Sequence, residues 1–394
     1  MNIIIFEDFF YKDLFPFTYN HASFEIKTGM YTNIERFIKS FSNYNLIVVV
    51  RDEIKDLIKE KFTNLTINPS VIPKGYCINS RVVWKDEYND LYFNENNYSD
   101  KQSLLIYNNK EKISLEKFTR ILKIKNKETI DDCSVLVINY LWNAIDLFEE
   151  MLNNDFLNND IDNLNEKFES VFYINESNIK IGNNVVIKAG TVLDAEKGPI
   201  IIGNNVTIDI GSKIQGPAFI DNDSYISPGA KIRGHCLIGE KCKIGGEITN
   251  SIFHAKSNKV HDGFIGHSYV GEWVNIGAGT NNSNLKNNYS TIKFNFSQKE
   301  IDTDRLFLGA MIGDYTRIGI SSMLNTGTFI GFGANIFGKE FSHKHTKSFS
   351  WGRNDIVELD KFLDTCKKMK KRRDETLSDI EKKLIVHLYD DKKK

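Results

Sequence analysis

Apolar positions follow two different periods along the chain. In the first part, short apolar runs of strand length, NIIIF at 2–6 and NLIVVV at 45–50, precede stretches with helical spacing at 29–41 and 51–62. The same reasoning predicts a strand at 134–139 and a helix at 141–152, before a polar stretch at 153–168 that indicates a linker. This alternation predicts an α/β domain over residues 1–170.

From residue 171 to residue 340 the period changes to six. Segments such as IIIGNN, VTIDIG and SKIQGP each carry a branched apolar residue, with Gly, Asn or Asp at a corner. The Gly-Pro pairs that begin at 198 and 216 are separated by three hexads, which predicts one coil of a triangular prism. With the apolar residues inside and successive coils paired in parallel, the pattern predicts a parallel β-helix.

Residues 341–394 are charged and have helical spacing. One helix is predicted around Val357, Leu359, Phe362 and Leu363, and a second around Leu384, Ile385 and Leu388. The basic run KKMKKRR at 367–373 suits a nucleic acid, a solvated helix face or a phosphate-rich ligand such as coenzyme A. Because the formal net charge is only −1, we expect neither nucleic acid nor a membrane surface as a partner.

Composition indicates a globular protein and the cellular compartment in which it is expected. The chain has 394 residues, 41% of them hydrophobic, which is enough for two domains with their own cores. Five cysteines without a C-x-x-C pair predict neither a disulfide framework nor a metal site. No apolar run approaches the length of a membrane span, and the first residues, MNIIIFEDFF, lack the basic segment of a signal peptide. These features predict a cytoplasmic protein.

Polar chemistry interrupts the repeat between residues 259 and 284. Lys259 and His261 precede a regular hexad, and 281–307 has no hexad pattern, which predicts a loop extending from a corner. Polar side chains buried without partners would destabilise a β-helix, so we expect them on its outer surface, facing a groove. A histidine there could accept a proton from an attacking amine near neutral pH. The alternative is a His261 that only pairs with Asp262.

This segment resembles the bifunctional glucosamine-1-phosphate acetyltransferase / N-acetylglucosamine-1-phosphate uridyltransferase family. His261, Phe264, the run NIGAGT at 275–280 and Asn284 match its acetyltransferase half without a gap, and the hexads resemble hexapeptide-repeat transferases. The resemblance implies a left-handed β-helix, a homotrimer and acetyl-CoA as co-substrate. It also implies the roles of particular residues: His261 as general base, Arg233 and Asn275 on a sugar phosphate, Ala278 and Asn284 on acetyl-CoA.

Two positions depart from the family pattern. Phe264 stands where the family has a tyrosine, and Thr249 stands where it has a lysine in the sugar site. Lys259 lies close by in the sequence and could take the place of that lysine on the sugar phosphate. The acceptor sugar is therefore left open.

The N-terminal region resembles a reduced sugar-nucleotidyltransferase-like domain, with LFPFT and FEIKTGMYTNIERF in the matching places of residues 1–50. The resemblance implies nucleotide binding by Asp8, Lys12, Thr18 and Arg81, and Mg²⁺ only if the domain is an active nucleotidyltransferase. The glycine-rich phosphate loop of such enzymes is missing, because the first glycine is Gly29. We therefore expect weak or absent nucleotidyl transfer.

The sequence thus predicts acyl transfer, with acetyl as the expected group, from an acyl-CoA to an amino sugar phosphate or a nucleotide sugar. Two alternatives stay open. One is a sugar-1-phosphate nucleotidyltransferase whose β-helix serves trimerisation, and the other is a non-catalytic trimeric regulatory or scaffold protein.

Overall fold

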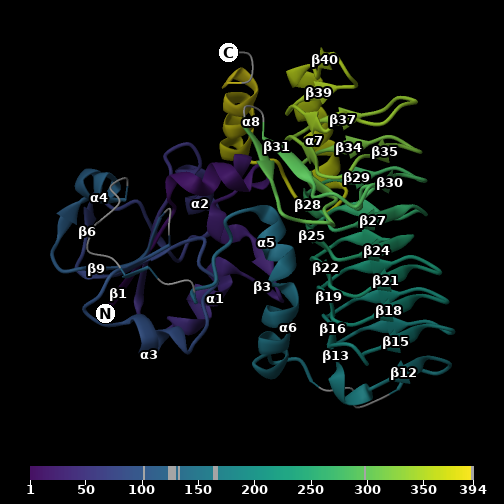
Figure 1. The fold of residues 1–394 in the computed structure, drawn as a ribbon, viewed down its shortest axis with the longest axis horizontal. Coiled ribbons are helices and arrows are strands. Elements are labelled where there is room, and N and C mark those ends of the chain that lie inside the picture. Colours follow the sequence, from purple (N-terminus) through teal and green to yellow (C-terminus); the bar gives the residue numbers. More distant parts are fainter. Residues whose placement is uncertain (101–102, 123–129, 132–133, 163–166, 297–298, 392–394) are drawn as a thin grey trace.

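The computed structural model describes residues 1–100, 103–122, 130–131, 134–162, 167–296 and 299–391. An α/β domain lies beside a long stack of short strands, and two C-terminal helices lie at one end of both (Figure 1). This arrangement confirms the predicted order of an α/β domain, a parallel β-helix and a helical C-terminal region. None of the helices in the described ranges is long and apolar enough to cross a membrane.

The N-terminal domain is built on a seven-stranded mixed sheet. Its strands, in spatial order, are β11 (Ile130–Asp131), β8 (Tyr98–Ser99), β9 (Leu104–Asn109), β7 (Gly75–Asn79), β1 (Asn2–Phe6), β4 (Asn45–Val49) and β5 (Thr66–Ile67). The central β1 pairs in parallel with both β4 and β7. Its side chains alternate between two buried clusters, as expected for a strand covered on both faces.

The described residues of this domain form six α-helices: α1 (Asn33–Ser40), α2 (Lys55–Lys61), α3 (Tyr88–Tyr92), α4 (Leu115–Ile121), α5 (Leu141–Asp146) and α6 (Phe148–Leu157). The strand predicted at 134–139 is wrong, since only Val137 pairs there, in an isolated bridge with Val82. The linker predicted at 153–168 is also wrong in its first part. The helix α6 continues through it, and Asp155 is a buried partner of Arg36 at 2.6 Å. Residues 163–166 of that stretch lie outside the described residues.

The β-helix has three faces, each a ladder of short strands that pair in parallel, except for the last strand on the groove face, which is antiparallel to its neighbour. The docking face holds β13 (Ile179–Ile181), β16 (Ile200–Ile202), β19 (Ala218–Ile220), β22 (Cys236–Ile238), β25 (Ser251–Ala255), β28 (Tyr269–Glu272), β33 (Ala310–Ile312), β36 (Thr328–Ile330) and β38 (His345–Thr346). The groove face holds β14 (Val186–Ile187), β17 (Thr207–Ile208), β20 (Tyr225–Ile226), β23 (Lys243–Ile244), β26 (Asn258–Lys259), β29 (Asn275–Ile276), β34 (Arg317–Ile318), β37 (Asn335–Ile336), β39 (Ser350–Trp351) and β40 (Asp355–Ile356). The open face holds β12 (Phe172–Ile174), β15 (Val192–Asp194), β18 (Lys213–Gln215), β21 (Lys231–Arg233), β24 (Glu247–Thr249) and β27 (Phe264–Gly266), with the pair β30 (Asn281–Asn282) and β35 (Met323–Leu324) beyond it.

Branched apolar residues fill the interior of the prism, as the hexads predict. On the groove face Ile208, Ile226 and Ile244 stack directly above one another and are buried. Corners are turned by residues in the left-handed backbone region, such as Asn184 with φ 55° and Asn205 with φ 57°. Strands continue as far as β40, so the limit that we drew at residue 340 falls inside the ladders.

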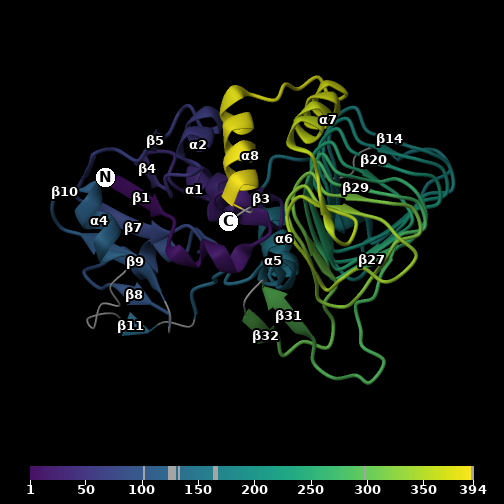
Figure 2. The same cartoon turned by 90° about the horizontal axis from the view of Figure 1, so that it is seen from above.

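The N-terminal domain covers the docking face, which therefore carries apolar residues outside as well as inside. Phe219, Leu237 and Tyr269 point outward from this face and pack in one cluster with Phe17 and Trp142 of the domain. Figure 2, seen from above, shows α5 and α6 against this face. The two units therefore share a continuous apolar interface.

The segment predicted as a free loop at 281–307 folds back instead. It contains an antiparallel hairpin of β31 (Lys293–Phe296) and β32 (Lys299–Asp302), which lies beside α5 in Figure 2. Phe294 packs edge to face on Trp142, and Arg305 forms an ion pair with Asp146. Aromatic contacts and this ion pair hold the hairpin on the N-terminal domain of its own chain.

The predicted C-terminal helices are confirmed as α7 (Leu359–Lys371) and α8 (Asp379–Asp391). Phe362 and Cys366 of α7 pack with Tyr315 and Phe332 of the β-helix, whereas Leu384 of α8 joins the core of the N-terminal domain. The C-terminal helices therefore contact both the β-helix and the N-terminal domain and connect the two.

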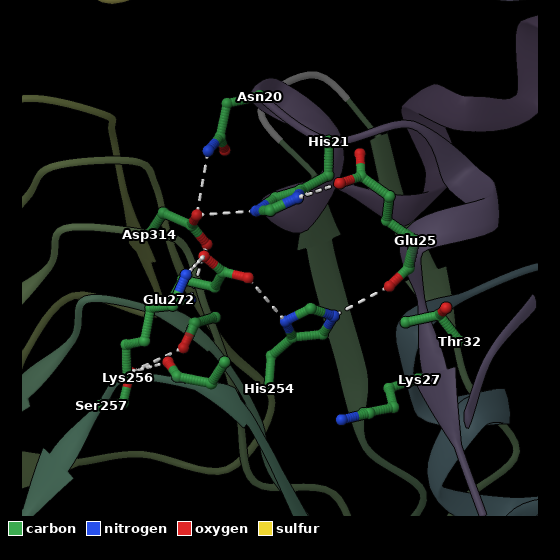
Figure 3. Close-up of polar contacts among 12 residues, drawn as sticks. Asn20, His21, Glu25, Lys27, Thr32, His254, Lys256, Ser257, Glu272 and Asp314 are labelled. Carbon is green, nitrogen blue, oxygen red and sulfur yellow. Dashed lines mark hydrogen bonds and ion pairs between the residues drawn. The ribbon is translucent and has the colours of Figure 1, made fainter. Parts of the chain in front are cut away.

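A buried network of charged groups lies within the apolar interface (Figure 3). His21 of the N-terminal domain binds Asp314 of the β-helix at 2.8 Å, and Lys27 binds Asp221 at 2.5 Å. His254 lies between the carboxylate of Glu272, at 3.1 Å, and the main-chain carbonyl of Glu25. These charges are paired across the interface, which is what allows them to be buried.

The environment of His21 raises its pKa to about 9. Burial lowers this pKa and Lys61 adds to the lowering, but Asp314 and Glu25 outweigh both. Because the folded pKa lies above the ordinary value of 6.5, the stabilisation is complete below pH 6.5 and is lost as the pH rises through about 9.

We expect Asp314→Asn to lower the free energy of unfolding by about 3–5 kcal/mol, because the buried charged His21 loses one of its two carboxylate partners. The deficit should shrink above pH 9, where the wild-type protein also loses the pair. Urea unfolding at pH 6.5 and pH 9.5 measures both effects. The control is Asp52→Asn, whose exposed pair with Lys55 should be worth at most about 1 kcal/mol. Equal shifts in both variants would contradict this account.

Candidate functional site

His261 lies at the corner between the groove face and the open face, between β26 and β27. Its side chain is exposed, as is that of Asp262. The groove face leads to this corner from one side and the open face from the other. The imidazole is therefore accessible to a ligand on either face.

The coil below this corner is shorter than its neighbours. On the docking face Ala218 pairs with Cys236, a step of three full hexads, whereas Cys236 pairs with Ser251, a step that is half a hexad shorter. Two of the three missing residues are lost at the corner of Gly245 and Gly246, because Tyr225 pairs with Lys243 but Lys231 pairs with Glu247. A Cβ atom on these glycines would lie 2.1 Å and 2.6 Å from main-chain oxygens of the coil above. A tight corner of two glycines thus lies directly below the corner of His261.

Arg233 and Asn275, both expected on the sugar phosphate, lie on different faces. Arg233 is exposed on the open face, where it binds Glu247 at 2.6 Å. Asn275 is exposed on the groove face, between Asn258 below and Arg317 above. One chain therefore does not bring these two side chains to a common phosphate.

The two residues expected on acetyl-CoA are also apart. Ala278 is at the same corner as His261, where its carbonyl accepts from the main-chain N–H of Ser321. Asn284 is past β30, at the far corner of the open face, and its side chain lies 2.9 Å from Nδ1 of His267. Burial lowers the pKa of His267 to about 4, and Arg305 adds to this effect, so His267 is neutral at physiological pH.

Lys259 does not lie on the outer surface. Its side chain points into the β-helix and is fully buried, in the column of inward residues above Ile244. Its ammonium group donates a hydrogen bond to the main-chain carbonyl of His261. The expectation that Lys259 contacts a sugar phosphate is therefore wrong, because the residue occupies an interior position of the strand.

A basic groove of about 720 Å³ lies on the groove face, between the β-helix and α7. Its cationic lining comes from Lys243, Lys256, Arg317, Arg372 and Arg373, and the described lining residues include no carboxylate. Tyr225, Trp273 and Asn275 add aromatic and polar surface. Val260, next to His261 in the sequence, is one of the lining residues, so the groove reaches the histidine corner.

The positive charge in this groove is only partly compensated. Burial lowers the pKa of both Arg317 and Arg373, which shows that their charges are poorly solvated. Arg373 donates to the side chain of Asn258, and Lys256 and Lys370 lie 5.5 Å and 5.4 Å from the centre of the Trp273 ring. A polyanion in this groove would be stabilised by several cations at once.

The nucleotide residues expected in the N-terminal domain have partners within the protein. Asp8 and Arg81 form a buried ion pair at 2.7 Å, at the carboxyl ends of β1 and β7. Thr18 is buried and donates to the carbonyl of Tyr11 at 2.6 Å, whereas Lys12 is exposed. In open α/β sheets, ligands bind at these strand ends. Here the ion pair occupies that position.

One group of possible metal ligands lies among the described residues. Atoms of His21, Glu272 and Asp314 are within 4.8 Å of one another. Each already takes part in the interface network, and the cationic Lys61 and Lys256 lie close by. The cysteines of the described part are buried free thiols, namely Cys77, Cys236, Cys242 and Cys366; Cys133 lies outside it.

Most of the residues that line the groove are not recognisable from the sequence. The signal was present in part, because the basic run at 367–373 supplies Arg372 and Arg373. Lys243, Asn258, Asn275 and Arg317 follow one another along the outside of adjacent strands of the groove face. An alignment of the coils in the sequence would show this column of outward residues. A constant spacing of 18 residues does not find it, because the short coil separates Lys243 from Asn258 by only 15 residues.

Comparison with known proteins gives matches for both parts. Residues 3–160 match the family described as sugar nucleotidyl transferase. A bifunctional sugar-1-phosphate nucleotidylyltransferase/acetyltransferase of Sulfurisphaera tokodaii is 33% identical over 198 residues, which are 50% of this chain and 43% of that protein. The bifunctional protein GlmU of Methanocaldococcus jannaschii is 26% identical over 72% of this chain and 67% of its own length. YaiX of Escherichia coli, described as an uncharacterized acetyltransferase, is 36% identical over 39% of this chain and 66% of its own length.

The chain spans less than half of the first of these relatives and about two thirds of the other two. The matches confirm the resemblance that the motifs indicated. Residues 3–160 match the sugar nucleotidyl transferase family, and the chain is similar to bifunctional GlmU-type proteins over part of their length.

Proposed function

We propose that this chain is a transferase that moves an acyl group, with acetyl as the expected group, from an acyl-CoA to the amine of an amino sugar phosphate or a nucleotide sugar. The observation that carries the proposal is the basic groove that is lined by Val260, next to the exposed His261. It combines a surface for a phosphate-rich cofactor with an accessible proton acceptor.

The reaction needs an amine without its proton. The amine nitrogen bonds to the thioester carbon, its proton passes to the imidazole of His261, and the C–S bond breaks with the proton returned to the CoA sulfur. An imidazole can accept a proton and then donate it, so a positioned histidine suits both transfers. The exposed position of His261 gives the amine access to the imidazole.

The groove fits the nucleotide end of coenzyme A. Lys243, Arg317, Arg372 and Arg373 can hold the phosphate groups of that cofactor, whereas Lys256 is already paired with Glu375 at 3.4 Å. The half-buried ring of Tyr225 offers a surface against which an adenine can stack. The volume of about 720 Å³ lies within the usual range for a cofactor pocket. The pantetheine arm would then lead past Val260 to the corner.

A homotrimer would complete the acceptor site. Arg233 and Asn275 are on separate faces of one chain, so they can meet only if the open face of one subunit lies against the groove face of the next. Exposed apolar residues at the upper end, among them Ile320, Phe337 and Trp351, offer surface for such contacts. The docking face is not available, because the N-terminal domain covers it.

In this proposal the N-terminal domain is a docking domain rather than a second catalytic centre. The buried pair of Asp8 and Arg81 stands at the strand ends where a nucleotide would bind. The alternative of sugar-1-phosphate nucleotidyl transfer is therefore disfavoured.

His261→Ala should lower the turnover of acyl transfer by about 10²–10⁴, the range for a lost general base. The assay is thiol release from acetyl-CoA with a panel of amino sugars, amino sugar phosphates and nucleotide sugars. His387→Ala, which removes an exposed histidine of α8, serves as control and should be unchanged. Full activity in His261→Ala would remove it as the base. Pyrophosphate release from UTP and a sugar phosphate, without thiol release, would support the nucleotidyltransferase alternative.

Arg372→Ala should weaken the binding of acetyl-CoA in the groove without affecting the chemical step. We expect KM for acetyl-CoA to rise about tenfold with kcat nearly unchanged, because a phosphate contact stabilises ground and transition states alike. The matched control is Lys382→Ala, an exposed cation on α8. Unchanged KM in Arg372→Ala together with wild-type salt dependence would place the cofactor elsewhere.

Mixed assemblies test the shared acceptor site. Arg233→Ala and Asn275→Ala should each be impaired alone at low acceptor concentration. Co-expressed in equal amounts, they should regain about one quarter of the wild-type activity, since random neighbours restore both residues at that fraction of interfaces. Arg233→Ala mixed with the double variant is the control and should regain nothing. Absence of recovery in the first mixture would show that the two residues act within one chain or not at all.

A further inference from the structure

A lysine interrupts a column of isoleucines inside the β-helix. On the groove face the inward residues of successive coils are Ile187, Ile208, Ile226, Ile244, Lys259, Ile276, Ile318 and Ile336. Lys259 is fully buried, and burial lowers the pKa of its ammonium group to about 8 although Asp262 opposes the shift. An isoleucine or methionine would fill this position without the cost of burying a charge. Packing alone therefore does not explain a lysine at this position. The hydrogen bond from its ammonium group to the carbonyl of His261 gives another reason.

The main-chain hydrogen bonds at this corner differ from those of the other coils. In regular coils, the carbonyl two residues after the inward isoleucine accepts from the coil above: Ala189 from Gly211, and Ile210 from Gly229. The corresponding residue after Lys259 is His261. The N–H of Gly279 above it goes to the carbonyl of Asp262 instead, one residue further along.

This shift by one residue leaves the carbonyl of His261 without the partner that its counterparts have. Polar main-chain groups that face a protein interior need a hydrogen bond. The ammonium group of Lys259 supplies it, reaching the carbonyl of His261 from within the prism. Neighbouring carbonyls are held by the ladder itself, that of Lys259 by Gly245 and that of Gly263 by Glu247.

We infer that Lys259 is a positioning residue for His261: from inside the β-helix its ammonium group binds the carbonyl of His261 and fixes the corner that presents the imidazole. The inference rests on the proposed function for its catalytic part only. It assigns to Lys259 a role toward the main chain of the corner, in place of a contact with the substrate.

Lys259→Met tests the inference, because methionine fills a similar space without the donor. We expect hydrogen–deuterium exchange of the amides at 260–264 to rise about tenfold, in line with the loss of one charge-assisted hydrogen bond. The thermal midpoint should stay level or rise, since an apolar side chain suits the column. In the transfer assay kcat should fall about tenfold or more while KM for acetyl-CoA is unchanged, since only the base has moved.

The matched control is Ile244→Met, the same new side chain one coil below in the same column. It should leave both the exchange at 260–264 and kcat unchanged. If Lys259→Met does not change that exchange, Lys259 does not hold the corner and the inference is overturned, whatever the activity. If the exchange rises but kcat stays at the wild-type value, the positioning of His261 is overturned.

The two proposals fail in different ways. A wild-type protein without thiol release for any acceptor would overturn the proposed function and the catalytic part of this inference. The exchange measurement needs no substrate, so it would still decide whether Lys259 holds the corner. A fall in thermal midpoint with both kcat and KM unchanged would mark Lys259 as purely structural and would also overturn the inference.

Discussion

Docking of the N-terminal domain on one face of the β-helix decides where the rest of the molecule can act. A triangular prism has three faces, and this one buries aromatic residues such as Phe219 and Tyr269 against the domain. The charges within that interface are paired, with His21 on Asp314 and Lys27 on Asp221. Only two faces and the corner between them remain for ligands or for other subunits, and His261 lies at that corner.

The same docking also builds the groove, through a series of contacts. Leu384 of α8 packs into the N-terminal domain, while Ile385 of the same helix packs with the cluster of the β-helix. Glu381 of α8 binds Lys370 of α7 at 2.6 Å and accepts a hydrogen bond from Tyr315 of the β-helix at 2.5 Å. The helix α7 is thereby held against the groove face and brings Arg372 to its lining. A helical region that the sequence presents as a charged tail is thus one wall of the groove.

The regular parts of this fold could be predicted from the sequence because their signal is local. Each hexad carries its own inward isoleucine or valine and its own corner residue, and the spacing of apolar residues in 357–363 and 384–388 is that of a helix. The interface could not be predicted in this way. His21 and Asp314 are far apart in the sequence, with a separation of 293, and a pattern within a short window contains no information on such a pair. Asp155 was assigned to a linker for the same reason, since its partner Arg36 belongs to a distant helix.

The motifs nominate candidate site residues but not their arrangement. His261, Asn275 and Arg233 are candidates from matching motifs, and a motif gives spacing along the chain and not the face on which a side chain lies. The assignment of Lys259 failed for a specific reason. A step of three full hexads from Ile244 leads to Asp262, whereas the shortened coil places Lys259 in the inward column. One shortened coil was enough to turn an expected surface lysine into an interior one.

That shortened coil connects the observations made at the histidine corner. Two of its three missing residues are lost at Gly245 and Gly246, a tight corner where the backbone above approaches too closely for any side chain. In the coil above, the hydrogen bond from the next coil is displaced by one residue, from His261 to Asp262. A carbonyl is left over, and a lysine in the isoleucine column binds it. The concentration of polar residues at 259–284 is therefore partly structural. Lys259 satisfies the carbonyl of His261 from inside the β-helix, and this hydrogen bond allows the repeat to carry an exposed histidine beside a basic groove.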